Sequence, residues 1–334
     1  MVSRISIFRP SFIYPFSTSL FGKNLRLSNQ SQKRLLVWGC SSGSQYGKKY
    51  FSVSDLRAWE WCEKQFEYDR QFGKYKSPTK PMKRGTARHK KLEEEVSKKV
   101  VVRKVSADDA WAAKFLNFLI CTNQLSLEGL TRELPLVSLV NGKWFVGKID
   151  ELRMPTVGMA QNPSLVDTKT RSQATLPSEP QKRNSRLQLM CYKYLWDTTI
   201  STNFPVDDFF NSFGLDPQHS LSKEIQDRAI NLGFHAETLG DLVMFYQSTC
   251  SALLPSQNEL LLRYEYQVDN SLLGEDTFSY DSDSFQSLMK NFVEFVGGQR
   301  DASYVPKNEN WKCRICSYAS VCPSTTTSHT IRHQ

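Results

Sequence analysis

The chain has 334 residues, of which 40% are hydrophobic and 12% aromatic, enough for one large or two ordinary domains with a substantial core. Of its 43 basic residues, eight lie in residues 1–54, which contain no Asp or Glu; the remainder holds 35 basic and 34 acidic residues. The net charge of +9 therefore does not by itself indicate a nucleic-acid-binding protein. No apolar stretch approaches the length of a transmembrane helix, so we expect no membrane association.

Residues 1–54 have the composition of an organellar transit peptide. The segment contains twelve Ser, is rich in Arg and lacks acidic residues. We expect a disordered leader that directs import into a chloroplast or mitochondrion, with the nucleus as the alternative destination. A disordered basic arm that binds nucleic acid is the alternative role for this segment. A single folded domain is expected over residues 55–323, followed by a tail at 324–334.

The first predicted helix covers residues 55–72, with Ser54 as its N-cap and Gly73 as its stop. Cys62 lies on this helix at helical spacing from aromatic residues, a setting typical of a core thiol. A basic linker, residues 74–84, comes next.

A second predicted helix begins after Gly85 and carries His89, and a third covers residues 107–121. A lone His on a helix is more often a surface residue than a ligand. Residues 132–140 then alternate like a strand, and Asn141-Gly142 is a hairpin-turn signal.

Two acidic residues and a lysine follow on neighbouring predicted strands. Asp150 lies on the strand over residues 143–152, and Asp167 lies on the next strand, where Lys169 points to the same face. Turn residues between the strands predict a hairpin that brings the acids together. Paired carboxylates repel unless a cation lies between them, and a hard cation such as Mg²⁺ suits oxygen ligands. The residues alone also fit a surface hairpin with a solvated Asp–Lys pair.

The C-terminal half predicts a mixture of helices and strands. A loop over residues 172–184 leads into a helix that carries Gln188 and Tyr192 on one face. Residues 200–235 are polar and have only weak helix signals. The remaining predicted elements are a helix over 241–254, strands over 259–268 and 277–280, and a helix over 285–296.

The sequence ends with a tight cysteine cluster in which Cys313, Cys316 and Cys322 follow a Cys-x2-Cys-x5-Cys pattern before Pro323. Three thiolates are one short of a closed zinc site or a cubane cluster, and Cys62 is the candidate for the fourth. The Cys-Pro ending and the lack of two matched Cys-x2-Cys pairs favour a 4Fe–4S cluster over zinc.

Taken in chain order, these features resemble the exonuclease V family, RecB-like nucleases of the PD-(D/E)xK superfamily that carry an iron–sulfur cluster. The resemblance covers residues 52–323 and indicates a plant-type organellar member. It implies an α/β fold with a central mixed sheet flanked by helices, a restriction-endonuclease-like core, and an iron–sulfur lobe built from both ends of the chain. The motifs that carry it are Cys62, Gly85-x3-His89, Gly147-Lys148-Ile149-Asp150, Asp167-Thr168-Lys169, Gln188-x3-Tyr192 and Cys313-x2-Cys316-x5-Cys322-Pro323.

The resemblance implies a role for each matched residue. Asp150, Asp167 and His89 would hold Mg²⁺ or Mn²⁺ together with the carbonyl of Thr168, and Lys169 would position the attacking water and stabilise charge on the phosphate. Asp167 stands where many relatives have Glu, which leaves occupancy by one or two metal ions open.

The helix residues Gln188 and Tyr192 would hold their helix against the site and contact DNA. The expected ligands of the 4Fe–4S cluster are Cys62, Cys313, Cys316 and Cys322.

The implied function is that of a metal-dependent exodeoxyribonuclease. It would act on single-stranded DNA as a monomer, mainly 5′→3′, and release short oligonucleotides in organellar or nuclear DNA maintenance and repair. Two alternatives remain at this point. An iron–sulfur DNA glycosylase shares the Cys-x2-Cys-x5-Cys ending, although Pro306 stands where its fourth Cys is expected. A non-catalytic iron–sulfur or zinc module that binds nucleic acid is the other.

Overall fold

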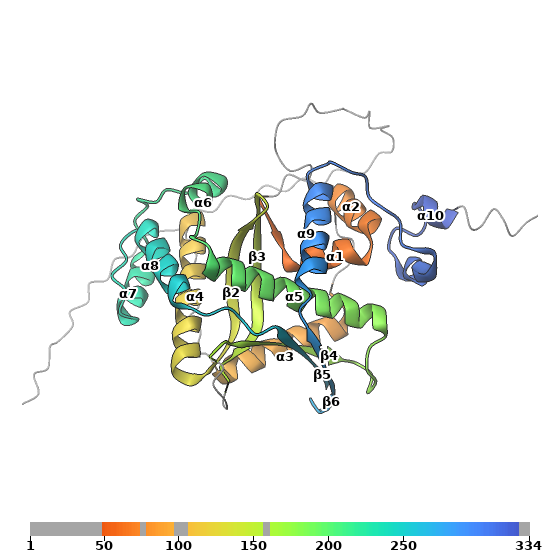
Figure 1. Cartoon of the computed structure of the whole chain (residues 1–334), viewed down its shortest axis with the longest axis horizontal. Coiled ribbons are helices and arrows are strands. Elements are labelled where there is room, and N and C mark those ends of the chain that lie inside the picture. The colour runs from red at the N-terminus through yellow and green to blue at the C-terminus, as the bar shows by residue number, and fades with distance from the viewer. Residues whose placement is uncertain (1–48, 74–77, 97–105, 156–160, 327–334) are drawn as a thin grey trace, which may run out of the picture. The chain divides into compact units, whose positions relative to one another are not determined.

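The structure, a computed structural model, describes residues 49–73, 78–96, 106–155 and 161–326, all within one compact unit (Figure 1). A six-stranded mixed sheet is flanked by helices, which confirms the predicted α/β class. The strands are β1 (Tyr50–Ser52), β2 (Leu130–Val140), β3 (Lys143–Arg153), β4 (Ser164–Arg171), β5 (Glu259–Tyr266) and β6 (Leu272–Ser279). The helices are α1 (Val53–Trp61), α2 (Glu63–Phe72), α3 (Lys80–Val96), α4 (Ala107–Glu128), α5 (Glu179–Ser201), α6 (Val206–Phe213), α7 (Lys223–Asn231), α8 (Leu239–Ala252), α9 (Ser282–Val296), the 3₁₀ helix η1 (Lys307–Ile315) and α10 (Pro323–Thr326).

Strand β3 is the centre of the sheet. Strand β2 pairs antiparallel with β3 from Val140↔Lys143 to Leu130↔Arg153, with one break in the ladder where Glu133 lies opposite Asp150. The turn between them is Asn141-Gly142, as predicted, and both residues have the positive φ of a type I′ turn (48° and 71°). Because β2 takes up one edge of β3, strands β1 and β4 must share the other edge.

The shared edge of β3 makes the sheet fork. Parallel strand β1 pairs with residues 144–146 of β3, and antiparallel strand β4 pairs with residues 151–153. Beyond the pair Glu151↔Val166, strands β3 and β4 separate, and the rest of β4 pairs only with β5. The predicted hairpin therefore exists, but it opens after three residue pairs.

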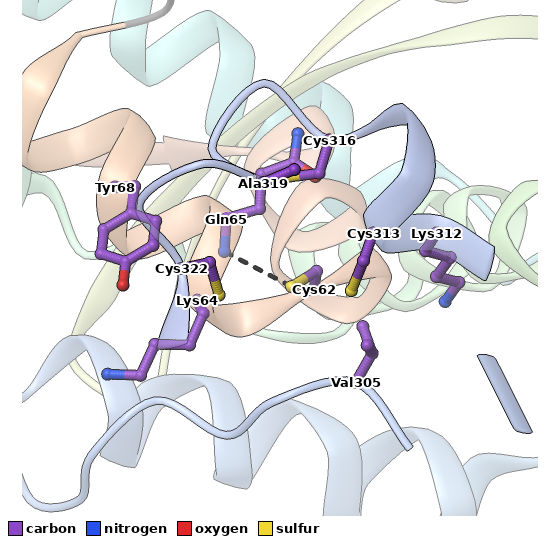
Figure 2. A pocket seen from close by; sticks show the side chains of 10 residues that line it. All are labelled: Cys62, Lys64, Gln65, Tyr68, Val305, Lys312, Cys313, Cys316, Ala319 and Cys322. Atoms are coloured by element: carbon purple, nitrogen blue, oxygen red, sulfur yellow. Dashed lines mark hydrogen bonds between the residues drawn. The ribbon is translucent and has the colours of Figure 1, made fainter. Parts of the chain in front are cut away.

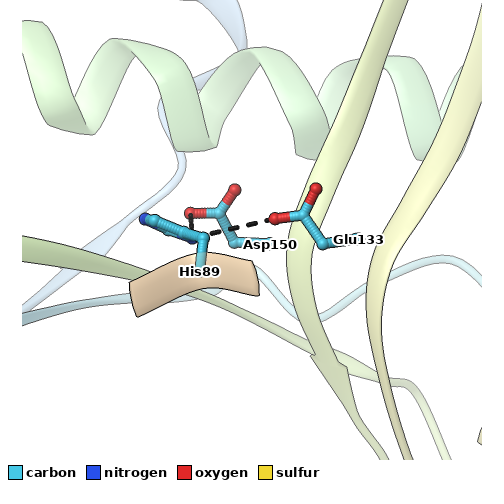
Figure 3. Close-up of side chains that lie close together, drawn as sticks. All are labelled: His89, Glu133 and Asp150. Carbon is cyan, nitrogen blue, oxygen red and sulfur yellow. Dashed lines mark ion pairs between the residues drawn. The ribbon is translucent and has the colours of Figure 1, made fainter. Parts of the chain in front are cut away.

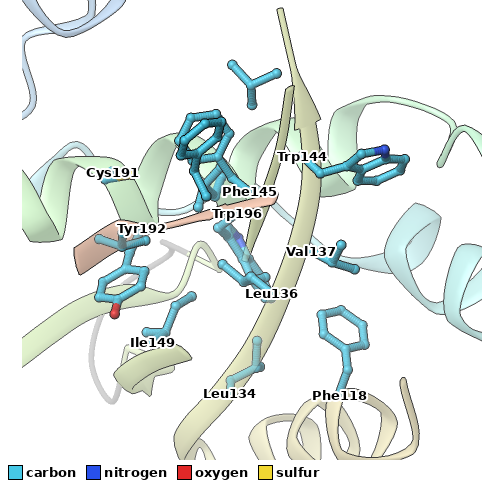
Figure 4. Packing of buried hydrophobic residues seen from close by; sticks show 14 of the residues in the cluster. Phe118, Leu134, Leu136, Val137, Trp144, Phe145, Ile149, Cys191, Tyr192 and Trp196 are labelled. Atoms are coloured by element: carbon cyan, nitrogen blue, oxygen red, sulfur yellow. The ribbon is translucent and has the colours of Figure 1, made fainter. Parts of the chain in front are cut away.

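Helix α5 packs along the sheet and contacts β2, β3, β4 and β5, while α4 packs on β2 and α8 packs on α4 and α5 (Figure 1). Fully buried Trp196 of α5 lies among side chains of β2 and β3, including Leu136 and Phe145 (Figure 4). The interior contacts of these large apolar side chains hold α5 on the sheet.

The predicted helix over residues 55–72 is wrong in two respects. Ser52, not Ser54, is the N-cap, because Ser52 and Asp55 form a reciprocal capping box. The helix is also broken at Cys62, whose extended backbone (φ −167°, ψ 113°) ends α1 and caps α2. Strand β1 (Tyr50–Ser52) lies within the predicted leader of residues 1–54; residues 1–48 of that leader lie outside the described residues.

Other predicted boundaries also move. Helix α3 begins at Lys80, so Gly85 lies inside it, and α5 begins at Glu179, which shortens the predicted loop. Two helices, α6 and α7, form in a region where the sequence shows only weak helix signals. Each is stabilised by burying its apolar residues. In the described part of the chain, no helix is both long and apolar enough to cross a membrane.

The C-terminal segment packs against α1 and α2. Arg300 forms a bidentate ion pair with Glu63 (2.7 and 2.8 Å), and Lys312 donates to the carbonyl of Trp61 (3.0 Å). Tyr318 Oη donates to Asp69 (2.8 Å). The two ends of the described chain are thus joined by charged contacts as well as apolar packing.

Gly147 on β3 is a test of the packing between α5 and the sheet. A Cβ at this position would lie 2.8 Å from Cε1 of Tyr192 and 2.9 Å from Cγ2 of Val53, both closer than real contacts. We expect Gly147→Ala to lower the free energy of unfolding by about 1–3 kcal/mol. Thermal unfolding would show this as a fall in Tm of about 2–4 °C per kcal/mol.

Gly85→Ala is the comparison, because the cost of its single close contact is offset by a gain in helix propensity. Its Cβ would meet only the side-chain oxygen of Thr170, at 3.1 Å, and Ala is the better helix former by about 1 kcal/mol. We expect its Tm to stay close to that of the wild type. Equal losses of Tm in the two variants would contradict the proposed packing role of Gly147.

Candidate active site

The fork in the sheet brings Asp150 and Asp167 together. They occupy the first position beyond the last β3–β4 pair, Glu151↔Val166, so they face each other where the strands separate. Asp167 is fully buried, and Oδ2 of Asp150 is buried without a hydrogen-bond partner. Burial and the nearby Asp167 raise the pKa of Asp150 well above its ordinary value. Burial acts in the same direction on Asp167, but the Lys169 ammonium and hydrogen bonds from Asp150 and Lys169 outweigh it and lower the pKa of Asp167.

Lys169 completes the predicted set on β4. Its Nζ lies 2.8 Å from Oδ1 and 2.6 Å from Oδ2 of Asp167, and it donates to Oε1 of Gln188 (2.8 Å). The amide of Gln188 lies 3.5 Å from the hydroxyl of Tyr192. Both α5 side chains are largely buried, at 8% and 7% exposure, so the structure gives them contacts that hold Lys169 and the helix. Their contact with DNA stays a prediction.

Helix α3 brings His89 to the same place. His89 Nδ1 lies 3.5 Å from Oδ2 of Asp150. Two features hold α3 there: Gly85 allows a close approach to Thr170 of β4, and Arg88 forms a bidentate pair with Glu265 of β5 (2.7 and 3.2 Å). In the predicted Gly85-x3-His89 motif, Gly85 therefore allows α3 to pack closely on β4, and His89 is the possible ligand.

Glu133 on β2 is a site residue that sequence reasoning missed. Its carboxylate lies 3.7 Å from Nδ1 of His89, and it is only 16% exposed. Its backbone has φ 53°, a left-handed conformation that costs a non-glycine residue about 1–2 kcal/mol. The signal was available: Glu133 is eight residues before Asn141 and Asp150 is eight residues after Gly142, so an in-register hairpin places them opposite each other.

The donor set fits a divalent cation. Asp150, Asp167, Glu133 and His89 offer three carboxylates and one imidazole, and the orphaned Oδ2 of Asp150 is a buried oxygen that a cation would satisfy. Thr168, which follows Asp167 in the sequence, is buried. The role of its carbonyl as a cation ligand stays a prediction.

The basic segments Lys74–Lys91 and Lys169–Arg186, with Tyr75 and Tyr192, are the sequence's candidate for a basic, aromatic groove that binds a single DNA strand. Part of the second segment makes internal contacts instead. Arg183 pairs with Glu60 and Glu309, and Arg186 pairs with Asp276 and Glu179. The exposed basic residues of the described part of this region lie mainly on α3, where they are Lys80, Lys83, Arg84, Lys90 and Lys91. Tyr75 lies outside the described residues.

The four predicted cluster cysteines line one pocket (Figure 2). Cys62 comes from the α1–α2 junction, where its Sγ accepts from the N–H of Gln65 (3.4 Å). Cys313 lies on η1, and Cys316 accepts from the N–H of Tyr318 (3.5 Å). The same four side chains form no disulfide.

The thiols influence one another electrostatically. Burial raises the pKa of Cys62 and of Cys313, and the neighbouring cysteines raise it further, while the N–H of Gln65 lowers that of Cys62. Four thiolates this close need positive charge among them, so the donor set suits a soft metal ion or an iron–sulfur cluster. The remaining described cysteines, Cys121, Cys191 and Cys250, are buried core thiols as predicted.

The chain is similar to known nucleases along most of its length. The family model "Exonuclease V – a 5′ deoxyribonuclease" matches residues 44–163, 158–237 and 226–323. Exonuclease V of Danio rerio is 30% identical over 285 residues, which cover 83% of this chain and 71% of the relative. The crystal structure of SSO0001 aligns with 83% of this chain and 87% of its own, at 12% identity and a TM-score of 0.35, too low to support an argument.

The sheet fork with its acids and lysine, together with these matches, defines a DNA exonuclease, a phosphodiester hydrolase. The chain belongs to the exonuclease V family. This membership disfavours the glycosylase and the non-catalytic module that the sequence had left open.

Asp150→Asn should make the metal-free protein more stable. The folded state holds the Asp150 proton more tightly than the unfolded chain does, so stability falls as pH rises above the ordinary carboxyl pKa of about 3.9. The variant lacks this loss. With EDTA at neutral pH we expect a gain of about 1–3 kcal/mol in the free energy of unfolding.

Thermal unfolding across pH would measure this effect. The Tm advantage of Asp150→Asn should grow as pH rises from about 4 toward neutrality. Added Mn²⁺ should raise the wild-type Tm and leave that of the variant nearly unchanged. A lower Tm for the variant in EDTA at every pH would contradict the repulsion inferred between Asp150 and Asp167.

Proposed function

We propose that this chain is a divalent-cation-dependent exonuclease that digests single-stranded DNA, mainly from the 5′ end, to short oligonucleotides. The observation that carries the proposal is the juxtaposition of Asp150, Asp167 and Lys169 at the fork, with His89 facing them. The family description as a 5′ deoxyribonuclease supports the polarity.

The residues divide the chemistry of phosphodiester hydrolysis among them. Asp150, Asp167 and His89 would hold Mg²⁺ or Mn²⁺, with the Thr168 carbonyl as a further ligand; the bound cation supplies charge that neutralises the phosphate and activates water. Lys169, held by Asp167 and Gln188, has its Nζ fixed beside the carboxylates, where it can orient the attacking water and stabilise the developing negative charge.

We propose that Cys62, Cys313, Cys316 and Cys322 bind a 4Fe–4S cluster. The four side chains line one pocket, and the Cys-Pro ending with the lack of two matched Cys-x2-Cys pairs supports the cluster over zinc. The cluster would join α1–α2 to the C-terminal segment and so close a long loop.

Location and assembly follow from the sequence expectations. We propose a monomer that functions in chloroplast or mitochondrial DNA maintenance, with the nucleus as the alternative location, on the basis of the acid-free, Ser-rich composition of residues 1–54. The restriction-endonuclease-like PD-(D/E)xK core is part of the same proposal, supported by the acids on β3 and β4 and the lysine two residues on.

Lys169→Ala should lower the rate of digestion of end-labelled single-stranded DNA by about 10²–10³, the loss expected when one preorganised charge-stabilising donor is removed. Asp150→Asn should be at least as slow because it removes a cation ligand. The measurement is single-turnover digestion with Mg²⁺, using strands blocked at the 5′ or the 3′ end to read polarity.

Matched controls come from an exposed ion pair on α7, Lys223 and Asp227. Lys223→Ala and Asp227→Asn change the same residue types on the surface and should digest DNA at the wild-type rate. Full activity of both Lys169→Ala and Asp150→Asn would rule out the proposed active site.

The cluster makes a separate prediction. The full chain purified without oxygen should be brown and contain about four iron atoms, the content of a 4Fe–4S cluster. Cys62→Ser and Cys313→Ser should lose iron and visible absorption, whereas Cys250→Ser, which changes a buried core thiol, should keep both. A colourless wild-type protein that contains one zinc would replace the cluster with a zinc site and leave the nuclease proposal standing.

A further inference from the structure

The hydroxyl of Tyr264 is a buried polar group for which the candidate active site has no role. Tyr264 lies on β5 and is only 1% exposed, and its Oη has no hydrogen-bond partner among the described residues. Such a group lowers stability, because it has lost the hydrogen bonds that it makes to water in the unfolded chain. Packing of the ring does not require the oxygen, since Phe would fill the same space. The hydroxyl therefore points to a partner that it meets in another state of the site.

Strand pairing places Tyr264 beside Lys169. The two residues are direct partners in the parallel β4–β5 ladder, so their side chains leave the same face of the sheet on strands about 4.8 Å apart. That face is the one covered by α5, because Lys169 donates to Gln188 of this helix (2.8 Å). The next residue on β5, Glu265, points to the opposite face and pairs with Arg88 of α3 (2.7 Å). Tyr264 and Lys169 are thus neighbours under α5.

The surrounding charges agree with this position. Burial raises the pKa of Tyr264 to about 12, and the carboxylate of Asp276 acts in the same direction. Asp167 adds a smaller effect of the same sign, which places the hydroxyl within electrostatic reach of the sheet fork. The group is a neutral phenol at neutral pH, able to accept as well as donate a hydrogen bond. The guanidinium of Arg186 also lies nearby, but it is bound to Asp276 (2.9 and 3.0 Å).

The ammonium of Lys169 would lose part of its present environment if the acids bound a cation. Its Nζ lies 2.8 Å from Oδ1 and 2.6 Å from Oδ2 of Asp167, and 2.8 Å from Oε1 of Gln188. A cation on Asp167 would repel the ammonium and compete with it for the carboxylate oxygens. Because the ammonium has three N–H groups, a bond given up to Asp167 must be replaced by another acceptor.

The two sides of the fork offer different surroundings to that ammonium. Toward β2, His89 and Glu133 gather around Asp150, with Nδ1 of His89 3.5 Å from Oδ2 of Asp150 (Figure 3). Toward β5, the side chain paired with Lys169 is Tyr264, whose oxygen is neutral and has no partner. Movement of the ammonium toward β5 takes it away from the expected cation ligands and brings it to an unused acceptor.

We propose that Tyr264 is a positioning residue for Lys169, whose ammonium donates a hydrogen bond to the tyrosine hydroxyl when Asp167 binds a cation. The bond keeps the lysine from competing with the cation for Asp167, and it satisfies the hydroxyl that is unpaired here. This inference rests on the proposed function and adds a residue that supports the cation-bound arrangement without touching the cation or the DNA.

Tyr264→Phe tests the proposal because it removes only the hydroxyl. With EDTA, its Tm should equal or exceed that of the wild type, since a buried oxygen without a partner has been removed. Its affinity for Mn²⁺, measured by calorimetry on the full chain, should be about tenfold weaker, the loss expected for one hydrogen bond to a charged group.

Tyr246→Phe is the matched control. Tyr246 is as buried as Tyr264, at 1% exposure, but its hydroxyl donates to the carbonyl of Val137 (3.3 Å). This variant should lose about 2–4 °C in Tm, because the carbonyl loses its donor, and should bind Mn²⁺ with the affinity of the wild type. A loss of Tm in Tyr264→Phe as large as that in Tyr246→Phe would overturn the proposal, because it would show a structural partner for the Tyr264 hydroxyl.

The action through Lys169 is tested in a second background. In Lys169→Ala, adding Tyr264→Phe should no longer change the affinity for Mn²⁺, because the ammonium that the hydroxyl would bind is gone. An equal loss of affinity with and without the lysine would overturn the proposal. Affinity at the wild-type level in the single variant Tyr264→Phe would overturn it as well.

Failure of this inference is distinguishable from failure of the nuclease proposal. If Lys169→Ala and Asp150→Asn stop DNA digestion while Tyr264→Phe binds Mn²⁺ normally, the positioning role is wrong and the nuclease stands. If Lys169→Ala and Asp150→Asn both digest DNA normally, the nuclease site is wrong, and the role given to Tyr264 is wrong with it. A wild-type chain that binds no Mn²⁺ would overturn both.

Discussion

The burial of Asp150 opposite Asp167 is the constraint on which the candidate site depends. Regular pairing of β3 and β4 would continue the ladder through these two positions, but the strands separate there instead. The separation leaves two carboxyl groups facing each other in a buried space, where only a proton, Lys169 or a cation can offset their charge. The arrangement that lowers stability here is also the one whose oxygen donors a divalent cation would satisfy, a trade that is common at functional sites.

Helix α5 connects this point to the cysteine pocket. Near its start, Arg183 pairs with Glu60 of α1 (3.0 Å) and with Glu309 of η1 (2.7 Å). Little more than one turn later, Gln188 holds Lys169. A single rigid helix thus fixes the position of the lysine relative to the segments that carry the four cysteines. The pocket is therefore well placed to support the site mechanically, as a brace rather than as a participant in the chemistry.

The sequence predicted those parts of the fold and site that depend on local patterns. Asn141-Gly142 fixed the β2–β3 hairpin, and its register also implied that Glu133 lies opposite Asp150, although this was not recognised. The structure brings together the acids with Lys169, and the four cysteines in one pocket, as the resemblance implied. The roles of these residues in catalysis and cluster binding still depend on experiment.

What could not be predicted depends on distant contacts. Ser52 and Ser54 are equally good N-caps by residue type, and strand β1, which pairs with β3 about a hundred residues away, selects the first. The break at Cys62 arises where the thiol turns toward a segment 250 residues later in the chain, which helix propensity does not reveal. Gly85 was expected to precede its helix because glycine is a poor helix former. It lies inside α3, where it approaches Thr170 closely, and this tertiary contact cannot be read from local sequence.

The position of β1 limits how far the amino end can be shortened. A chain that starts at Asp55 would lack the strand that covers residues 144–146 of β3, the cap of α1, and the buried ring of Phe51 that packs on Phe145 and Phe292. It would leave an open sheet edge beside an apolar hollow, a surface prone to aggregation. Only a cut upstream of Tyr50, whether in the cell or in the laboratory, keeps β1, the ring of Phe51 and the cap of α1 together.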